Sequence, residues 1–169
     1  MDGDGAAAAR HVSAEGNGMI IGMTLHVLAA VIWVGGMFFA HMVLRPSAGP
    51  LEPAVRLSLW SRVFPRFFFW VWLSVASLLV SGFGMVFLGL GGFAAVAGSV
   101  DAMTALGVVM TAIFAYIYFA PWPRFRRAVS AADWPIAEAN LRAIRLLVTT
   151  NLTLGLVTSA IGAGGPYLG

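Results

Sequence analysis

Long apolar segments and shorter polar segments alternate along the chain. The apolar segments lack the regular alternation of apolar and polar neighbours that is typical of a strand in a membrane barrel. Their lengths lie near the roughly 20 residues that an α-helix needs to cross the hydrocarbon core of a bilayer. The four segments are residues 18–44, 67–90, 102–120 and 146–163.

These segments predict four transmembrane helices. Lipid offers no hydrogen bonds to the backbone, so a spanning segment without barrel periodicity has to satisfy its own amide groups as a helix. The predicted fold is therefore all-α, an integral membrane bundle of four antiparallel transmembrane helices. Residues 1–17 are small and polar, and we expect them to form a flexible tail ahead of a single membrane domain, 18–169.

The composition supports this interpretation and narrows the chemistry. Of the 169 residues, 60% are hydrophobic and 10% are charged, and the mean hydropathy of +0.88 is far above that of a soluble domain. The absence of cysteine excludes disulfides, thiolate metal sites and cysteine nucleophiles. The sequence has no nucleotide-binding glycine loop, no nucleophile elbow and no pair of carboxylates within a span, so no class of enzyme is indicated.

The basic residues predict the orientation of the bundle. All ten are arginine, and nine lie in or beside the first and third connections, whereas the second connection, 89–101, has none. By the positive-inside rule, both arginine-rich connections face the cytoplasm of a bacterial-type inner membrane and both termini lie outside. The net charge of +3 thus relates to the membrane rather than to nucleic acid. The nine are Arg45, Arg56, Arg62, Arg66, Arg124, Arg126, Arg127, Arg142 and Arg145.

Proline and tryptophan also mark the cytoplasmic connections. Because proline interrupts helices, Pro65 is expected to separate the first two spans and Pro121 to end the third. Residues 51–66 and 128–145 are interpreted as amphipathic segments on the inner leaflet. Three tryptophans are interpreted as anchors at the membrane surface. They are Trp60, Trp122 and Trp134.

The first span carries two histidines in the run TLHVLAAVIWVGGMFFAHMVLRP, residues 24–46. Burying an imidazole without a partner costs about 1–3 kcal/mol. Each ring should therefore be hydrogen-bonded, hold a metal or lie at the wet edge of the membrane. His26 lies deep in the span and is a candidate functional residue, whereas His41 lies four residues before Arg45, near the inner surface.

A helical projection places soft metal ligands on one face of this span. The members of this stripe fall within about 60° of one another at 100° per residue. Thioether sulfur and imidazole nitrogen suit Cu(I) better than zinc, calcium or magnesium. The same spacing is also typical of an inward helix face on which methionine fills gaps. The stripe consists of Met19, Met23, His26, Met37 and His41.

Two other functions remain open for His26. It can serve as the axial ligand of a b-type haem, although the other spans contain no opposing histidine. The sixth ligand of the haem iron would then be Met85, Met103 or Met110, or a residue of a second subunit. Otherwise the iron would be five-coordinate. Alternatively, the chain is a structural or accessory membrane subunit whose histidines only bond to neighbouring helices.

The second and fourth spans contain polar residues at helical spacing. Ser74, Ser77, Ser81 and Gly84 predict close helix contact, with the hydroxyls bonding back to their own helix or across the interface. Asn151 is predicted to bond to another helix, because an asparagine near the midplane needs a partner.

The residues 25–39, LHVLAAVIWVGGMFF, resemble the opening helix of the copper-resistance D (CopD) family, in which a histidine is followed by a tryptophan and a glycine pair. The closing segment LRAIRLLVTTNLTLGLVTSAIGAGGP is similar to that family's last helix. The resemblance implies the core domain of an inner-membrane bundle linked to copper uptake, with His26 as the helix-one histidine. It also makes a periplasmic copper-binding protein a candidate partner.

The opening helix is more distantly similar to that of the HemJ-type protoporphyrinogen oxidases. These are four-helix membrane proteins that bind b-type haem through the helix-one histidine, so this resemblance implies haem at His26. That family also uses a lysine on a later helix, and this chain has no lysine. The resemblance therefore extends to haem binding and not to oxidase activity.

Overall fold

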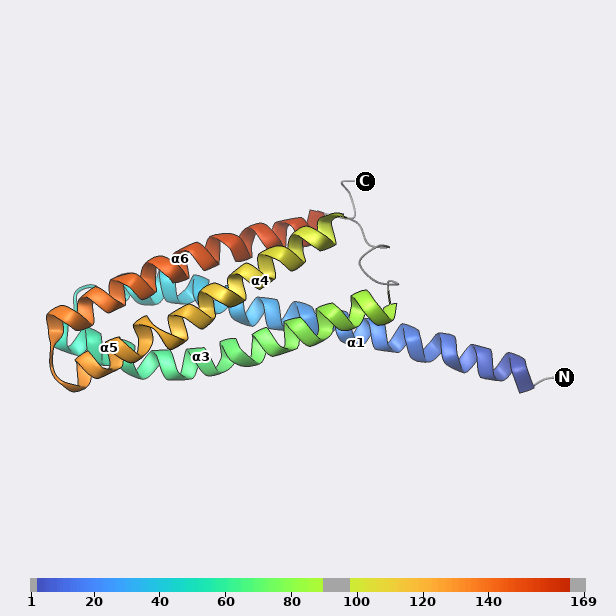
Figure 1. The fold of residues 1–169 in the computed structure, drawn as a ribbon, viewed down its shortest axis with the longest axis horizontal. Coiled ribbons are helices and arrows are strands. Elements are labelled where there is room, and N and C mark those ends of the chain that lie inside the picture. The colour runs from blue at the N-terminus through green and yellow to red at the C-terminus, as the bar shows by residue number, and fades with distance from the viewer. Residues whose placement is uncertain (1–2, 90–97, 165–169) are drawn as a thin grey trace.

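The structure is a computed structural model that describes the backbone of residues 3–89 and 98–164. Its described residues form long helices, with short turns at residues 48–52 and 131–133 (Figure 1). Two turns of π-helix interrupt or extend them. In chain order the elements are α1 (Gly3–Phe39), η1 (Ala40–Leu44), α2 (Arg45–Ser47), α3 (Pro53–Gly84), η2 (Met85–Gly89), α4 (Gly98–Phe119), α5 (Pro121–Ser130) and α6 (Trp134–Gly164).

Four of the helical stretches are long and apolar enough to cross a membrane, which confirms the predicted all-α fold and the number of spans. Each is longer than the sequence predicts, mainly at the arginine-rich end. The predicted division into a polar tail and one membrane domain stays a prediction, and α1 already begins at Gly3. The candidate spans are Gly16–Ser47, Pro53–Phe87, Gly98–Ser130 and Trp134–Gly164.

The helices pack as two antiparallel pairs. α1 packs mainly against α3, and α4 mainly against α6. The pairs meet near α5, which packs against α6, and they diverge toward the opposite end (Figure 1). In the second pair, the described part of α4 before Met110 and of α6 after Gly155 has no buried residue. We call the end near α5 the closed end and the opposite end the splayed end.

An aromatic core fills the closed end. Phe64 and Phe68 of α3 stack with 5.2 Å between their ring centroids. Phe68 meets Phe114 of α4 and Trp122 of α5 edge to face, each at 5.6 Å. Phe125 completes the group at 5.8 Å from Phe64. Such contacts add about 0.5–1.5 kcal/mol per pair to the burial of the rings, so this end is held tightly.

Two predictions about the connections are wrong. Pro65 lies inside α3 and does not separate two helices, because residues on both sides of it, Trp60, Phe64 and Phe68, bury one continuous face. Packing of that face outweighs the cost of a proline inside a helix. Trp60 and Trp122 are 3% and 6% exposed and belong to the core, so they are not surface anchors.

The predicted amphipathic segments are helical but do not lie apart from the bundle. Residues 51–66 contribute the first turns of α3, and 128–145 divide between the end of α5 and the start of α6. The amphipathic helix of this region is α5. It buries Trp122, Phe125 and Ala128, and it carries Arg124 and Arg126 between them.

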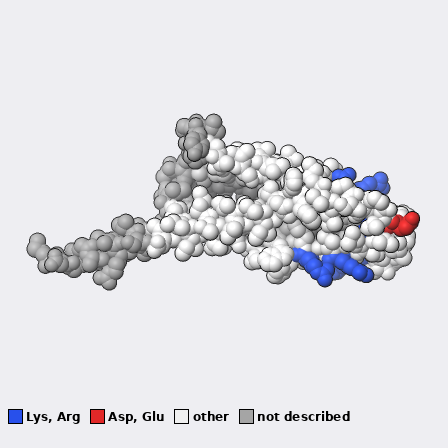
Figure 2. Space-filling view, turned by 180° about the vertical axis from the view of Figure 1, so that it is seen from behind, with Lys and Arg blue, Asp and Glu red and all other residues white. Residues whose placement is uncertain are grey.

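The arginine side chains gather at the closed end. Figure 2 shows the basic residues in blue at one end of the face that it presents. On α3, Arg62 and Arg66 are exposed beside Phe69 and Trp70, which are 64% and 51% exposed. Exposed arginines next to exposed aromatic residues are typical of the level at which lipid headgroups meet the hydrocarbon core.

Candidate functional site

The structure places the five predicted ligands of the first span in three different environments. Met37 is 2% exposed and lies in the aromatic core beside Trp33. Met23 is 55% exposed, outside the helix contacts. Met19, His26 and His41 are partly buried. Of the five residues, only Met37 is fully enclosed by the bundle.

His26 lies in the contact between α1 and α3. Its Nδ1 is 3.0 Å from Oγ of Ser81, which is 7% exposed. A Cβ added at Gly82 would lie 3.2 Å from Cε1 of the imidazole. The ring therefore rests against the α3 backbone at Gly82, where the neighbouring helix has no side chain. Of the polar and small residues predicted to mediate contact in the second span, Ser81 bonds both to its own helix and across the interface, whereas a Cβ at Gly84 would meet nothing within 4 Å.

Met85 is the residue that copper-based reasoning from the sequence missed. It begins η2 and reaches across to α1, where a Cβ at Gly22 would lie 3.3 Å from its Cγ and 3.7 Å from its Sδ. Gly22 precedes His26 by one helical turn, and Met85 follows Ser81 by one turn. The sequence named Met85 only as a possible haem ligand. The feature of the sequence that could have indicated this contact is Gly22, which lies four residues before His26 and leaves room for a side chain of another helix.

His41 is held by a different helix. It lies in η1, and its Nδ1 is 3.1 Å from Oγ1 of Thr149 on α6. π-helical turns are frequent at functional sites, and both of those in the described chain carry a candidate ligand, His41 in η1 and Met85 in η2. The two histidines thus link the first span to one helix of each pair, His26 to α3 and His41 to α6.

One face of the segment between the two histidines is buried in the bundle. Trp33 and Met37 are buried there, and Trp33 meets Phe114 at 6.3 Å. Nearby, Asn151 of α6 donates a hydrogen bond from Nδ2 to the carbonyl oxygen of Met110, 3.2 Å away. The predicted bond from Asn151 to another helix is therefore confirmed, and that helix is α4. Its Oδ1 has no hydrogen-bond partner among the described residues.

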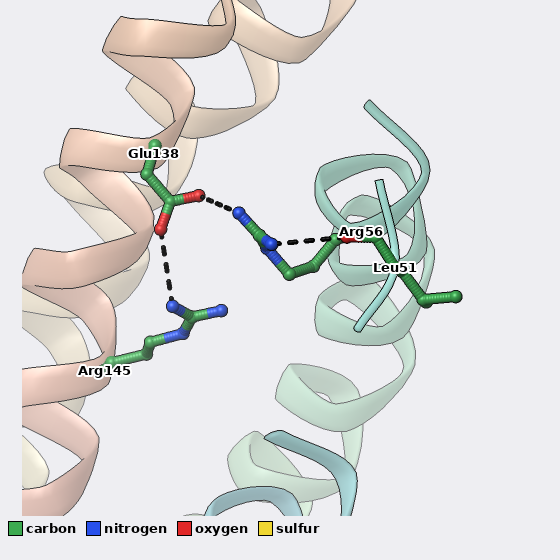
Figure 3. Close-up of polar contacts among 4 residues, drawn as sticks. All are labelled: Leu51, Arg56, Glu138 and Arg145. Carbon is green, nitrogen blue, oxygen red and sulfur yellow. Dashed lines mark hydrogen bonds and ion pairs between the residues drawn. The ribbon is translucent and has the colours of Figure 1, made fainter. Parts of the chain in front are cut away.

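An ion network that the sequence did not predict closes the arginine-rich end. Glu138 of α6 accepts from Arg56 of α3 at 3.1 Å and from Arg145 at 3.5 Å (Figure 3). Arg56 also donates to the carbonyl oxygen of Leu51 at 3.3 Å, and the Arg145 guanidinium lies 5.8 Å from the ring centre of Trp60. The carboxylate thus ties α3 to α6 next to the aromatic core.

The candidate ligands around His26 are imidazole and thioether groups, which carry little charge and suit soft metal ions. In the described part of the chain, no three histidine or acidic side chains come together in a way that could hold a metal ion. The thioether of Met85 lies against Gly22, one turn before His26 on α1. Imidazole with thioether is a ligand set that favours Cu(I) over harder ions.

These features define a multi-pass membrane protein built as a four-helix bundle, with a polar histidine contact inside its first span. The family model of copper resistance protein D, CopD, matches residues 61–164, which is more than half of the chain. The protein belongs to the CopD family. The matched residues include Ser81, Met85 and Thr149 but begin after the first span. No curated protein and no solved structure is similar enough to this chain to count as a match.

Proposed function

We propose that this protein binds Cu(I) in the splayed half of the bundle, with His26 as the principal ligand, and passes the ion toward the closed end. The observation that carries the proposal is the imidazole of His26 inside a membrane span, with the thioether of Met85 lying against Gly22, one helical turn before His26 on α1. An ionisable residue at such a position is costly and is usually functional. Membership of the copper-resistance family supports copper as the ion.

The neighbouring methionines complete the proposed ligand set. Met85 lies across the helix contact, against Gly22, and Met19 lies on the same face of α1 as His26. Met23, which is more exposed, is suited to the first capture of an arriving ion. Thioethers bind Cu(I) without a charge of their own, so each site holds the ion weakly enough to release it, as transport requires.

The route inward continues through Met37 to His41. Because Met37 is buried among aromatic residues, passage of an ion requires the two helix pairs to separate near Trp33. The two pairs already diverge at the splayed end, so only their contact at the closed end would have to open. His41, bonded to Thr149, is then the last ligand before the arginine-rich surface.

The orientation of the bundle follows from the arginines. With the closed end on the cytoplasmic side of a bacterial inner membrane, both termini and the splayed end face the outside. Copper would then enter from that side, delivered by a periplasmic copper-binding protein. Movement from the splayed end to the closed end is uptake into the cytoplasm.

The test is a titration of the purified protein with Cu(I) in competition with a chromophoric Cu(I) chelator. We expect stoichiometric binding that His26→Ala weakens by more than roughly tenfold, at least about 1.4 kcal/mol of binding free energy. His11→Ala, in the polar N-terminal segment, is the matched control and should bind as the unchanged protein does. Equal affinity of both variants would refute His26 as the principal ligand.

An absorption spectrum of the same sample separates copper from haem. Cu(I) with imidazole and thioether ligands gives no visible band, whereas a b-type haem gives a Soret band. A Soret band that disappears in His26→Ala would replace the copper proposal with the haem alternative. Neither copper nor haem in the purified protein, with no binding on titration, would leave a structural or accessory role.

A further inference from the structure

The two membrane histidines are held by the same arrangement of atoms. Ser81 has its Oγ 2.6 Å from the carbonyl oxygen of Ser77, one turn earlier on α3, and 3.0 Å from Nδ1 of His26. Thr149 has its Oγ1 2.8 Å from the carbonyl oxygen of Arg145, one turn earlier on α6, and 3.1 Å from Nδ1 of His41. In each case one hydroxyl joins a backbone carbonyl to an imidazole nitrogen.

The hydrogen atoms in this arrangement can be assigned from the chemistry of the groups. A hydroxyl has one proton to donate, and a carbonyl oxygen has none. At separations of 2.6 and 2.8 Å, the hydroxyl proton has to lie between the two oxygens, since two oxygens that close without a proton repel each other. The hydroxyl oxygen then has only lone pairs left for the imidazole. The Nδ1 atom of each histidine must therefore be the donor.

The opposite assignment is unfavourable at both positions. If Nδ1 of His26 carried no proton, the hydroxyl of Ser81 would have to turn toward it and leave the carbonyl oxygen of Ser77 in a contact without hydrogen. The carbonyl oxygen of Ser77 still accepts the backbone N–H of Ser81 within α3, so the cost of this assignment is the repulsion between two oxygens 2.6 Å apart with no hydrogen between them. The same reasoning applies to Thr149 and His41.

We propose that Ser81 and Thr149 are positioning residues that hold His26 and His41 as Nδ1–H tautomers and so present the Nε2 lone pair of each ring to a metal ion. The hydrogen bonds assign Nδ1 as the donor, and in a neutral ring this is the Nδ1–H tautomer. Its use in metal binding rests on the proposed function. A metal-bound histidine usually donates its other ring N–H to a partner that fixes the ring, and the partners here are hydroxyls of the facing helices.

The arrangement also gives the two rings different mechanical roles. Ser81 fixes His26 within the pair of α1 and α3, so the outer ligand keeps its place if the two pairs move apart. Thr149 fixes His41 between α1 and α6, so the inner ligand lies across the contact between the pairs. Separation of the pairs would break the second bond and leave the first intact.

Nitrogen NMR of the protein labelled with ¹⁵N-histidine, in lipid and without copper, tests the tautomers directly. The two nitrogens of a neutral ring have separate shifts, according to which one carries the proton. We expect Nδ1–H for His26 and His41, with the three histidine signals assigned by single replacement. Nε2–H at either membrane histidine in the unchanged protein would overturn the proposal for that residue.

Variants of the hydroxyl residues test their role as the cause. Ser81→Ala should shift His26 to a mixture of tautomers and Ser81→Thr should restore Nδ1–H, while Thr149→Val and Thr149→Ser should do the same for His41. Ser159→Ala and Thr153→Val are matched controls, because these hydroxyls also bond to the carbonyl one turn earlier but are not among the histidine partners of the described residues. A Nδ1–H signal that survives Ser81→Ala would show that Ser81 is not the positioning group.

Copper binding supplies the second readout. Ser81→Ala should lower the affinity for Cu(I) by roughly 10–100-fold, the usual effect of removing the partner of a metal-bound histidine, and Ser81→Thr should recover most of it. Unchanged affinity in Ser81→Ala, alongside a shifted tautomer, would overturn the positioning role. If His26→Ala itself binds Cu(I) normally, the proposed function fails, and the tautomer assignment is still decided by NMR.

Discussion

Met85, the first residue of η2 after α3, lies directly over Gly22 of α1. A Cβ at Gly22 would be 3.3 Å from Cγ and 3.7 Å from Sδ of Met85, so the glycine leaves just enough room for the thioether. One turn after Gly22 on α1, the imidazole of His26 lies over Gly82. Here the side chain comes from α1 and the glycine from α3. Each helix thus supplies one ligand-bearing side chain and one glycine to the same contact.

This pairing predicts that Met85 contributes to Cu(I) binding. Met85→Leu keeps the volume and apolar character of the side chain but removes the sulfur, so packing changes little. We expect the affinity for Cu(I), measured by chelator competition, to fall by roughly tenfold or more. Met42→Leu is the control, because Met42 is 56% exposed on the same first span. Equal losses in both variants would show that the effect is not specific to the site.

The glycine pair that follows Trp33 predicts two opposite effects on stability. A Cβ at Gly36 would lie 2.8 Å from Cε2 of Phe67, which packs against the core, so Gly36→Ala should destabilise the protein by about 1–3 kcal/mol. Gly35 has nothing within 4 Å of its would-be Cβ. Gly35→Ala should be neutral or stabilise the helix by up to about 1 kcal/mol. Unfolding in detergent measures both, and equal behaviour of the two variants would contradict the close contact.

The fold was largely predictable because membrane spans follow from length and apolar character alone. The ends of α3 and α6 were not predictable, because the turns before residues 67 and 146 are polar on one side and buried on the other. Pro65 illustrates the difficulty. Its sequence signal indicates a break, whereas burial of Trp60, Phe64 and Phe68 along one face keeps the helix continuous.

The candidate site was predictable only on one helix. The projection of the first span places Met19, His26 and Met37 on one face without an alignment or a structure. The partners across the helix contacts, Ser81 and Thr149, depend on how α3 and α6 pack against α1. That packing is set by small residues and bulky side chains far apart in the sequence, which no periodicity within one segment reveals.

The ion network at the closed end predicts a loss of stability when its single acid is neutralised. Glu138→Gln leaves Arg56 and Arg145 close together without a carboxylate. Since these side chains are 20% exposed, solvent screens part of the repulsion, and we expect a loss of about 1–3 kcal/mol in detergent unfolding. Glu52→Gln, at an exposed position before α3, is the control. No difference between the two variants would mean that the network does not hold α3 to α6.

The orientation of the bundle can be tested with single cysteines, because the chain has none of its own. Asp101 is exposed near the start of α4 at the splayed end, and Ser47 is exposed at the end of α2 near the arginines. In cells with a permeable outer membrane, we expect an impermeant maleimide to label Asp101→Cys. It should label Ser47→Cys only after the inner membrane is broken. The positive-inside rule requires this result, since the connection that carries Arg45 and Arg56 must remain in the cytoplasm. The reverse labelling pattern would place the splayed end, and with it the proposed copper entrance, on the cytoplasmic side, and the proposed direction of transport would then be export.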